Sequence, residues 1–476
     1  MAEHMGPVTL TTHPVQRAGA WAVAVLAGRG APEEVSRADL EKVVGRVVED
    51  VCAAAVAGKD TPAYDWWKVL FSQYPNSKAT HSKRSRNRDV LRPEVEGLFA
   101  PDSMTDVPSA VYGCTFCGRL ASVVWTKTVL PMFDTSKALN TLPPRVAGWP
   151  VCWGCRVAAW ALPYGAWVTA GSATVLTCEE PSAERVFAAR MVQRAQRVIQ
   201  AGFASLPATA HPERVVAMAL RRLGPGLPST AVLWTFKNDN QEPWLRVTRT
   251  RRATSRFLAV VDGRAPVRAG WHLLEEALTV RDRVGTVVTN GREAVARLLF
   301  EAEDGQSRSL LSQVYRVLEG RTDDWSPHER EALAGLAFTY AKEVLGMEPK
   351  LTAVATLLAD WIEHGSASSR GKFAEYRKVA LNDYQLGALL MQAQSRLLLD
   401  GHTPAAGPDD WAAVIGQRPR VWEQRMLLFA AVMQQLAQRG VAVSQKVPAD
   451  EDDQIEQLVK QPILQADEDD FEEGAA

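Results

Sequence analysis

Two Cys-x-x-Cys pairs constrain the fold of this chain more than any other feature of its sequence. Cys114 and Cys117 form the first pair, Cys152 and Cys155 form the second, and 34 residues separate them. Each pair places two thiolates on one tight turn, and two such turns complete a tetrahedral metal site. Zinc suits four thiolates because it has no redox chemistry and accepts a tetrahedron. We therefore expect a structural Zn²⁺ in a zinc-finger-like insertion, with no open coordination position.

Two other interpretations of these cysteines stay open, namely buried thiols without a metal and a redox-active dithiol. The interval between the pairs is longer than in a typical zinc ribbon, which makes the pattern less specific. The chain has only six cysteines, and Cys52 and Cys178 fall in apolar segments outside the pairs. Such sparing use of cysteine fits the reducing cytoplasm better than a disulfide-stabilised secreted protein. We expect a cytoplasmic protein.

Chain length and hydrophobic pattern predict an α+β protein with several domains. The chain has 476 residues, too many for one ordinary core, and no apolar run reaches the roughly 18 residues that cross a bilayer. We predict a mixed N-terminal domain that carries the cysteine-rich zinc insertion, followed by an all-α C-terminal helical bundle. The predicted segments are 1–106, mixed helical with a basic loop; 107–180, the zinc insertion; 181–300, the mixed α/β remainder; 301–447, the bundle; and 448–476, an acidic disordered tail.

One helix start in the predicted bundle is marked especially clearly. Ser326 stands at the N-cap position, Pro327 at the first helical position, and Glu329 is placed to close a capping box. The sequence therefore predicts that a helix begins at Pro327.

The formal net charge of −1 averages two opposed regions. Residues 450–476 hold 11 acidic residues and one lysine, so residues 1–449 keep 54 − 1 = 53 Lys+Arg against 55 − 11 = 44 Asp+Glu. The body of the chain is therefore basic, with a net charge of +9. A basic body suits a polyanionic partner such as nucleic acid, although an arginine-rich background composition would produce the same excess.

Three segments concentrate the side chains expected to contact nucleic acid. The loop 76–88 is expected to be too polar to pack, so that its cations reach phosphates and its amides reach base edges. The second segment lies on or beside a strand, where alternation predicts one shared face for Arg249 and Arg251. The third opens a helix of the predicted bundle. The candidates are Asn76, Ser77, Lys78, Lys83, Arg84, Arg86, Arg88, Arg249, Arg251, Arg252, Arg370 and Lys372. For each segment by itself, the alternative is an ordinary solvated surface.

The sequence contains no catalytic constellation. It has no Walker loop, no GxGxxG, no GxSxG and no HExxH, and its eight histidines are scattered. We therefore expect a protein that is not an enzyme.

Several short motifs follow one another in an order that is typical of one protein family. They are "HPVQRAGAWAVAVLAGRGAPEEVSRADLEKVV" from residue 13, "QYPNS" from 73, "CTFCGR" from 114, "VLPMF" from 129, "AGWPVCWGC" from 147, "ALPYG" from 161 and "VLWTFKND" from 232. Taken in this order, over about residues 12–260, the chain resembles the large subunit of type I CRISPR interference complexes (Cascade), in the type I-B-like branch. The arginine-rich strand at 246–256 and the acidic tail depart from the family's pattern.

The resemblance implies a non-catalytic subunit of a crRNA-guided surveillance complex. Such a subunit recognises the protospacer-adjacent motif in duplex DNA, assists DNA opening and R-loop formation, and helps to recruit the helicase–nuclease. The implied partners are crRNA, target double-stranded DNA, the backbone, 5′-handle-binding and small subunits of the complex, and the helicase–nuclease, with no membrane. The implied zinc would hold the insertion against the N-terminal domain.

Other identities stay open beside this resemblance. The large subunit of a type IV CRISPR complex can also carry a cysteine finger. From another class, the chain could be a zinc-containing nuclease or effector with an unrecognised site. A zinc-stabilised transcription factor would need a recognition helix with clustered base-reading side chains, and the sequence shows none.

Overall fold

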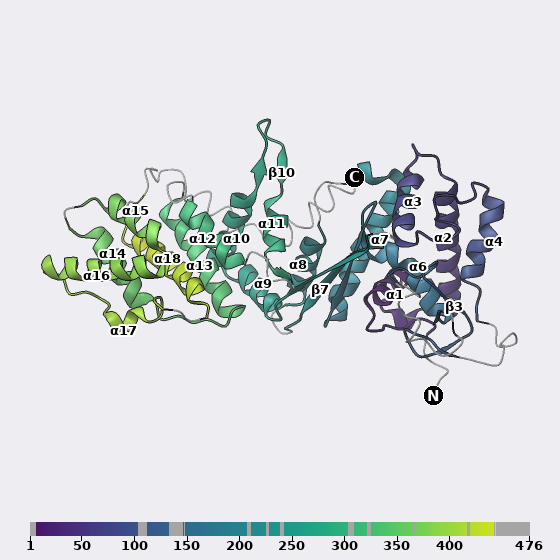
Figure 1. The fold of residues 1–476 in the computed structure, drawn as a ribbon, viewed down its shortest axis with the longest axis horizontal. Coiled ribbons are helices and arrows are strands. Elements are labelled where there is room, and N and C mark those ends of the chain that lie inside the picture. The colour runs from purple at the N-terminus through teal and green to yellow at the C-terminus, as the bar shows by residue number, and fades with distance from the viewer. Residues whose placement is uncertain are drawn as a thin grey trace. The chain divides into compact units, whose positions relative to one another are not determined.

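The protein divides into two compact units, each of which is described by itself (Figure 1). In this computed structural model, the first unit comprises Met1–Arg222 and Thr230–Arg249, and the second comprises Leu223–Ser229 and Thr250–Ala476. The structure describes residues 6–102, 112–132, 146, 148–206, 211–224, 228–238, 242–302, 309–320, 325–365, 367–416, 419–441 and 443. The predicted acidic tail therefore lies outside the described residues.

The first unit is mainly helical, and two of its helices pack unusually closely. Its helices are α1 (Pro14–Leu26), α2 (Arg37–Val56), α3 (Pro62–Gln73), α4 (Arg88–Leu98), α6 (Trp153–Gly165), α7 (Pro181–Ala201) and α8 (Pro212–Arg222), with short 3₁₀ turns η1 (Pro32–Glu34) and η3 (Phe203–Ser205). A Cβ added to Gly19 of α1 would lie 1.8 Å from the carbonyl oxygen of Ala158 in α6. A Cβ added to Gly165 would lie 2.5 Å from the carbonyl oxygen of Ala18. Small residues thus let α6, which is buried along its whole length, form the centre of this core.

An antiparallel sheet completes the first unit. Its strands are β5 (Trp167–Val168), β6 (Ala173–Cys178), β7 (Ala231–Lys237) and β8 (Trp244–Thr250), and they lie in the order β8-β7-β6-β5. Val175 and Phe236 extend the sheet into the hydrophobic core that includes α1, α6 and α7. Both helices α1 and α7 contact β6, so the core lies between these helices and one face of the sheet.

The second unit is built mostly from helices. They are α9 (Thr254–Gly263), α10 (Ala265–Leu278), α11 (Gly291–Arg297), α12 (Leu310–Gly320), α13 (Pro327–Glu343), α14 (Thr352–Glu363), α15 (Ser369–Val379), α16 (Asp383–Leu399), α17 (Pro408–Trp411) and α18 (Val421–Gln438). Helix α13 contacts α10, α12 and α18 and therefore lies at the centre of this unit. Its predicted start is confirmed, because the Ser326 hydroxyl accepts a hydrogen bond from Glu329 N and the Glu329 carboxylate accepts one from Ser326 N.

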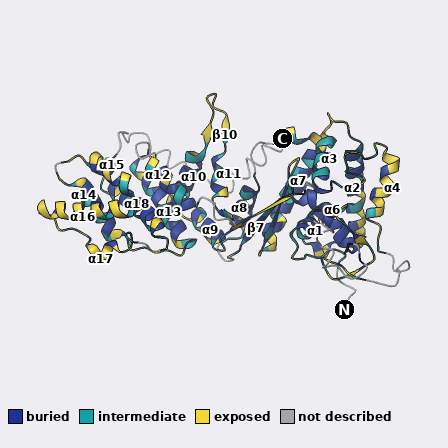
Figure 2. Cartoon of the chain, in the orientation of Figure 1, coloured by how far each residue is buried: buried dark blue, intermediate teal, exposed yellow. Residues whose placement is uncertain are grey.

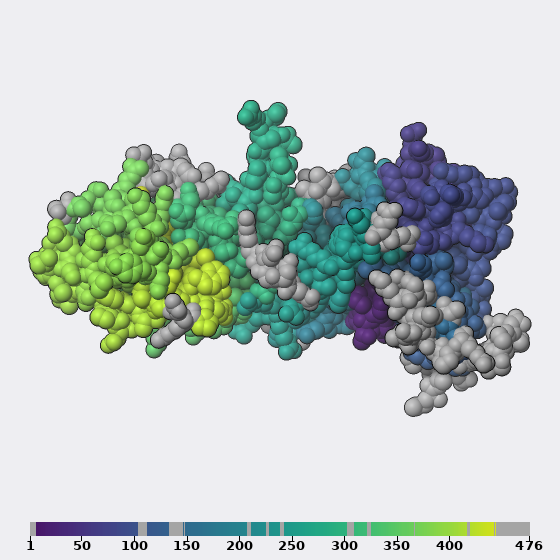
Figure 3. Space-filling view, in the orientation of Figure 1, coloured from purple at the N-terminus to yellow at the C-terminus, as the bar shows by residue number. Residues whose placement is uncertain are grey.

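A two-stranded hairpin projects from the second unit between α10 and α11 (Figures 1 and 3). The hairpin consists of β9 (Val280–Arg281) and β10 (Val287–Thr289), whereas β11 (Phe300–Ala302), which follows α11, is not part of it. The residues of the hairpin are mostly exposed (Figure 2), and Val284 at the tip has 89% of its surface accessible. The carboxylate of Asp282 accepts hydrogen bonds from the backbone N–H groups of Val284 and Thr286, which fixes the turn.

The predicted mixture of helix and sheet, with a cysteine cluster, is confirmed. The prediction of an all-α C-terminal bundle from residue 301 stays a prediction, since β11 includes Glu301 and several later residues lie outside the described ranges. Within the described parts of the chain, no helix has both the length and the apolar character needed to cross a membrane.

Candidate functional site

The first cysteine pair lies in the turn of a short hairpin. Strand β1 (Tyr112–Gly113) pairs with β2 (Leu120–Ala121), and the turn between them carries Cys114 and Cys117. The backbone N–H of Cys114 donates to the Arg119 carbonyl at 2.6 Å, and that of Gly118 donates to the Cys114 carbonyl at 2.9 Å. Gly118 has a φ of +75°, a left-handed conformation that glycine adopts without a steric penalty. The turn therefore directs both thiols to one side.

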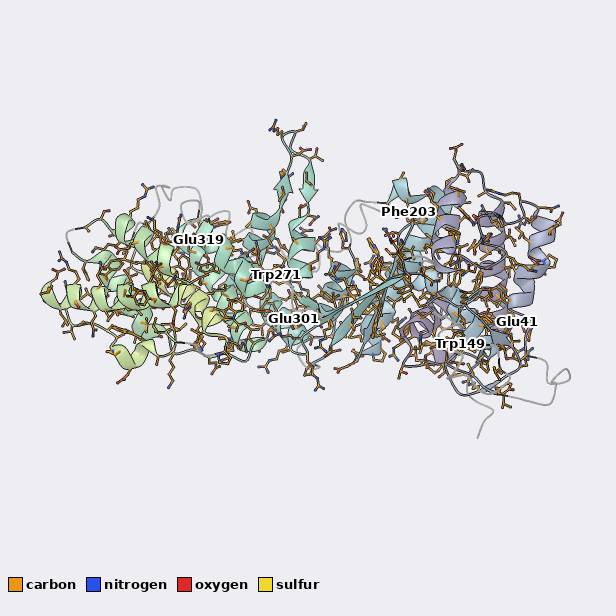
Figure 4. The ribbon with its side chains drawn as sticks, viewed as in Figure 1. Glu41, Trp149, Phe203, Trp271, Glu301 and Glu319 are labelled. Carbon is orange, nitrogen blue, oxygen red and sulfur yellow. The ribbon has the colours of Figure 1, made fainter. Side chains whose placement is uncertain are left out.

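The second pair lies where a strand leads into the central helix. Strand β4 (Trp149–Pro150; Trp149 is labelled in Figure 4) pairs with β3 (Val124–Trp125) and is followed by α6. Cys152 precedes the first residue of α6, and Cys155 lies in its first turn. The positive end of the helix dipole favours thiolates at this position. The N–H of Thr115 donates to the Pro150 carbonyl at 2.8 Å, which joins the two pairs.

The four thiols form one compact cluster. All four Sγ atoms lie within 4.8 Å of one another, and those of Cys117 and Cys152 are 3.5 Å apart. Zinc–sulfur bonds of about 2.3 Å imply about 3.8 Å between the sulfurs of a regular tetrahedron. Hydrogen bonds from Cys117, Cys152 and Cys155 lower the pKa of the Cys114 thiol, as expected where sulfurs this close share protons. The donor set therefore fits a metal ion, with Cys117 half-buried and the other three thiols buried.

The N-terminal segment covers this cluster, which sequence reasoning did not predict. Gln16 is fully buried and its Nε2 lies 3.8 Å from the Sγ of Cys155, while the same amide donates to the Thr9 carbonyl at 2.8 Å. A Cβ added to Gly154 would lie 1.9 Å from the carbonyl oxygen of Pro7. No local pattern could have indicated the contacts of Gln16 with Cys155 and of Pro7 with Gly154, because more than 100 residues separate these partners in sequence.

A buried arginine anchors the start of α6 to the preceding segment. Arg156 donates to the Leu98 and Ala100 carbonyls at 2.9 and 2.8 Å and pairs with Asp102 at 2.9 Å. Burial lowers the pKa of Arg156, and the Asp102 carboxylate opposes that effect. The second oxygen of Asp102 accepts from the Trp153 N–H at 2.8 Å. The cluster is thus tied to the end of α4 as well as to the N-terminus.

The expectation that segment 76–88 is too polar to pack is wrong. Ser77, Ala79 and Thr80 are buried, and the indole N–H of Trp67 donates to the Thr80 carbonyl at 3.0 Å. The segment packs because its polar groups find partners in the chain, so burial leaves few of them without a hydrogen bond.

Two of the candidate arginines in this segment make structural contacts. The guanidinium of Arg84 lies 3.7 Å from the ring centre of Trp67, and its Nε donates to the Ala55 carbonyl at 2.6 Å. Burial lowers the pKa of Arg84 to about 10, which still leaves it charged at neutral pH. Arg86 is exposed but donates to the Ala57 carbonyl at 2.7 Å. Arg84, with 7% of its surface accessible, is therefore not available to a phosphate.

The other cations of the segment face solvent. Lys78 pairs with Glu94 at 2.9 Å, and Arg88 pairs with Glu49. The ammonium of Lys83 is exposed and has no ion pair within the described ranges. Asn76 is half-buried and, with Ser77 and Lys78, borders a cavity of about 350 Å³. The same cavity is also lined by residues of α4 and by Thr128 and Val129, which follow β3 of the cysteine insertion.

The candidates of the second segment lie at the end of β8 and just after it. Strand β8 ends at Thr250, so Arg249 is an exposed strand residue of the first unit and Arg251 follows the strand in the second. Arg251 pairs with Glu301 at 2.6 Å, whereas Arg252 is exposed. Strand alternation therefore does not extend to Arg251, because the strand ends one residue before it.

The third segment separates into one exposed and one buried cation. Arg370 is exposed at the start of α15. Lys372 is buried, and its ammonium donates to the Trp361 carbonyl at 2.8 Å and to the His364 carbonyl. Burial lowers the pKa of Lys372. This lysine caps the C-terminal end of α14 and is therefore a structural residue.

Comparisons with known proteins give no match for this chain. No family model matches the sequence, no curated protein matches it, and no solved structure matches its fold.

Proposed function

We propose that this protein is the non-catalytic large subunit of a type I CRISPR surveillance complex, and that it binds nucleic acid through surfaces positioned by a structural zinc site. Its proposed tasks are recognition of the protospacer-adjacent motif in duplex DNA, assistance in R-loop formation, and recruitment of the helicase–nuclease. The ordered motifs over residues 12–260 support the family, and the basic body of the chain suits a polyanionic partner.

One observation carries the proposal of a DNA-contacting surface. The basic segment and the cysteine insertion border the same cavity, which is lined by Asn76, Lys78 and Thr128 among others. Lys83 and Arg86 of the same segment are exposed. The buried residues Ser77, Ala79 and Thr80 hold the segment in place. A metal in the four-cysteine cluster would fix β3 and the residues that follow it, and so would fix one side of this surface.

Zinc would be structural, because four thiolates fill a tetrahedron and leave no position for a reactive water. That coordination disfavours the nuclease interpretation. The helices after residue 309 would form the C-terminal bundle along the path of the DNA strands, and the protein would work in the cytoplasm with crRNA and the other subunits of the complex.

Co-purification tests the assignment to a complex. The tagged chain, expressed from its native gene neighbourhood, should carry crRNA and repeated backbone subunits with it. Recovery of the chain by itself from cells that express the whole neighbourhood would contradict the proposal. Recovery with type IV backbone subunits would replace it by the type IV alternative.

A matched pair of lysine variants tests the basic segment. Lys83 and Lys42 are both exposed, and neither ammonium has an ion pair in the described part of the chain. Lys83→Ala should weaken duplex binding by the assembled complex and flatten its log–log salt dependence by about 0.9 for one lost phosphate contact. Lys42→Ala should change neither. Equal salt slopes for wild type and both variants would place segment 76–88 away from DNA.

A further inference from the structure

The strand register of the first unit brings an exposed tryptophan and two cations to one face of the sheet. Thr174 pairs with Thr235, which pairs with Arg246, so these side chains form one row across β6, β7 and β8. Lys237 and Trp244 face each other in the next pair along the same face. We call Thr235, Lys237, Trp244 and Arg246 the basic sheet face.

The two β8 residues of this face are exposed and, among the described residues, their side chains have no polar or ring partner. Trp244 has 43% of its surface accessible, and Arg246 is also exposed. In the part of the chain that the structure describes, neither side chain has a hydrogen bond, ion pair or ring contact. Being two positions apart on one strand, they lie about 7 Å apart on the same side.

A second tryptophan of the sheet provides a contrast. Trp167 of β5 pairs with Thr174 and so begins the same row. The guanidinium of Arg194 lies 3.7 Å from its ring centre, and the ring of His211 stacks on it at 5.9 Å. Trp167 is therefore already covered, and Trp244 is the tryptophan of this face left open to a planar ligand.

The charge of the face selects among possible ligands. The strand positions on this side, from β6 to β8, carry Lys237 and Arg246 and no Asp or Glu. An exposed tryptophan beside an exposed guanidinium matches a ligand that has both flat apolar faces and negative charges. Unpaired nucleotides have both, because their bases are free to stack and their phosphates are anionic.

We propose that the basic sheet face binds single-stranded nucleic acid, with a base stacked on Trp244 and the adjacent phosphate held by Arg246. A duplex fits this face less well, because its bases already stack on one another. This proposal rests on the proposed function for the source of the ligand, since opening a DNA duplex releases a single strand.

The test uses the purified full-length chain and a fluorescein-labelled oligothymidylate, with binding followed by fluorescence anisotropy. Trp244→Ala should weaken binding by about 5- to 150-fold, the range of one base–aromatic stack. Trp244→Phe should restore most of the affinity because it keeps an aromatic face. Arg246→Ala should lower the log–log salt slope by about 0.7, the value for one phosphate contact to a single strand.

Two exposed residues outside the face serve as controls. Lys42 of α2 is exposed, and Trp422 of α18 has 47% of its surface accessible. Lys42→Ala and Trp422→Ala should bind oligothymidylate like wild type. The Trp244 and Arg246 variants should melt close to wild type, since among the described residues neither side chain has a hydrogen bond, ion pair or ring contact.

The inference and the proposed function fail in different ways. Wild-type affinity of the Trp244→Ala variant for oligothymidylate, or no binding by wild type, overturns the inference whatever the co-purification shows. An equal loss of duplex affinity in that variant overturns the preference for a single strand. If Trp244 is needed for oligothymidylate binding while no crRNA or complex subunits co-purify, the binding face stands and the CRISPR assignment falls.

Discussion

Replacing Arg84 with alanine is expected to destabilise the first unit without directly removing a DNA contact. The Nε donates to the Ala55 carbonyl at 2.6 Å, a hydrogen bond from a charged group worth about 1.5–3 kcal/mol. The guanidinium lies 3.7 Å from the ring centre of Trp67, which adds about 0.5–2 kcal/mol. These contributions share one side chain and do not simply add, so the unfolding free energy should fall by about 2–4 kcal/mol.

Thermal and urea denaturation measure this loss. For a unit of this size, about 2–4 kcal/mol lowers the melting temperature by roughly 4–16 °C. Lys83→Ala, one residue away, should change the unfolding free energy by less than about 0.5 kcal/mol because its exposed ammonium has no ion pair in the described chain. The reasoning is refuted if Arg84→Ala melts like wild type while its affinity for duplex DNA falls, since that pattern belongs to a phosphate contact.

Three further changes have expected outcomes. Replacing Cys114 and Cys117 with serine should release one zinc per chain, measured by elemental analysis, and lower the melting temperature. Absence of zinc from wild-type protein prepared with an ample supply of zinc would contradict the proposed metal site. Gly19→Ala should lower the free energy of unfolding by more than about 3 kcal/mol or prevent folding, because the added Cβ would lie 1.8 Å from a backbone oxygen. Gly45→Ala is the control: the space around Gly45 is open, so this change should stabilise α2 by about 0.5–1 kcal/mol. Burial raises the pKa of Asp50 above 3.8, so the contribution of this carboxyl to stability is lost as pH rises through its folded-state pKa. The stability difference between wild type and Asp50→Asn should therefore change across that pH range, and a difference that does not depend on pH would contradict this.

The sequence by itself determined the features that depend on neighbours a few residues apart. A Cys-x-x-Cys turn brings its two thiols together wherever it occurs, and both pairs have that spacing. The capping box at Ser326 and Glu329 likewise needs only one helical turn, and its hydrogen bonds form as predicted. The mixed helix and strand content could also be predicted, since it follows from short-range periodicity.

Only the tertiary structure decided which polar side chains face solvent and which are structural. Arg84 and Lys372 look like surface cations in the sequence. In the structure both are buried, and both donate hydrogen bonds to backbone carbonyls distant from them in the chain. The position where β8 ends separates Arg249 from Arg251, and the strand register places Trp244 and Arg246 on one face. These outcomes depend on long-range packing, which brings together groups that no local spacing relates.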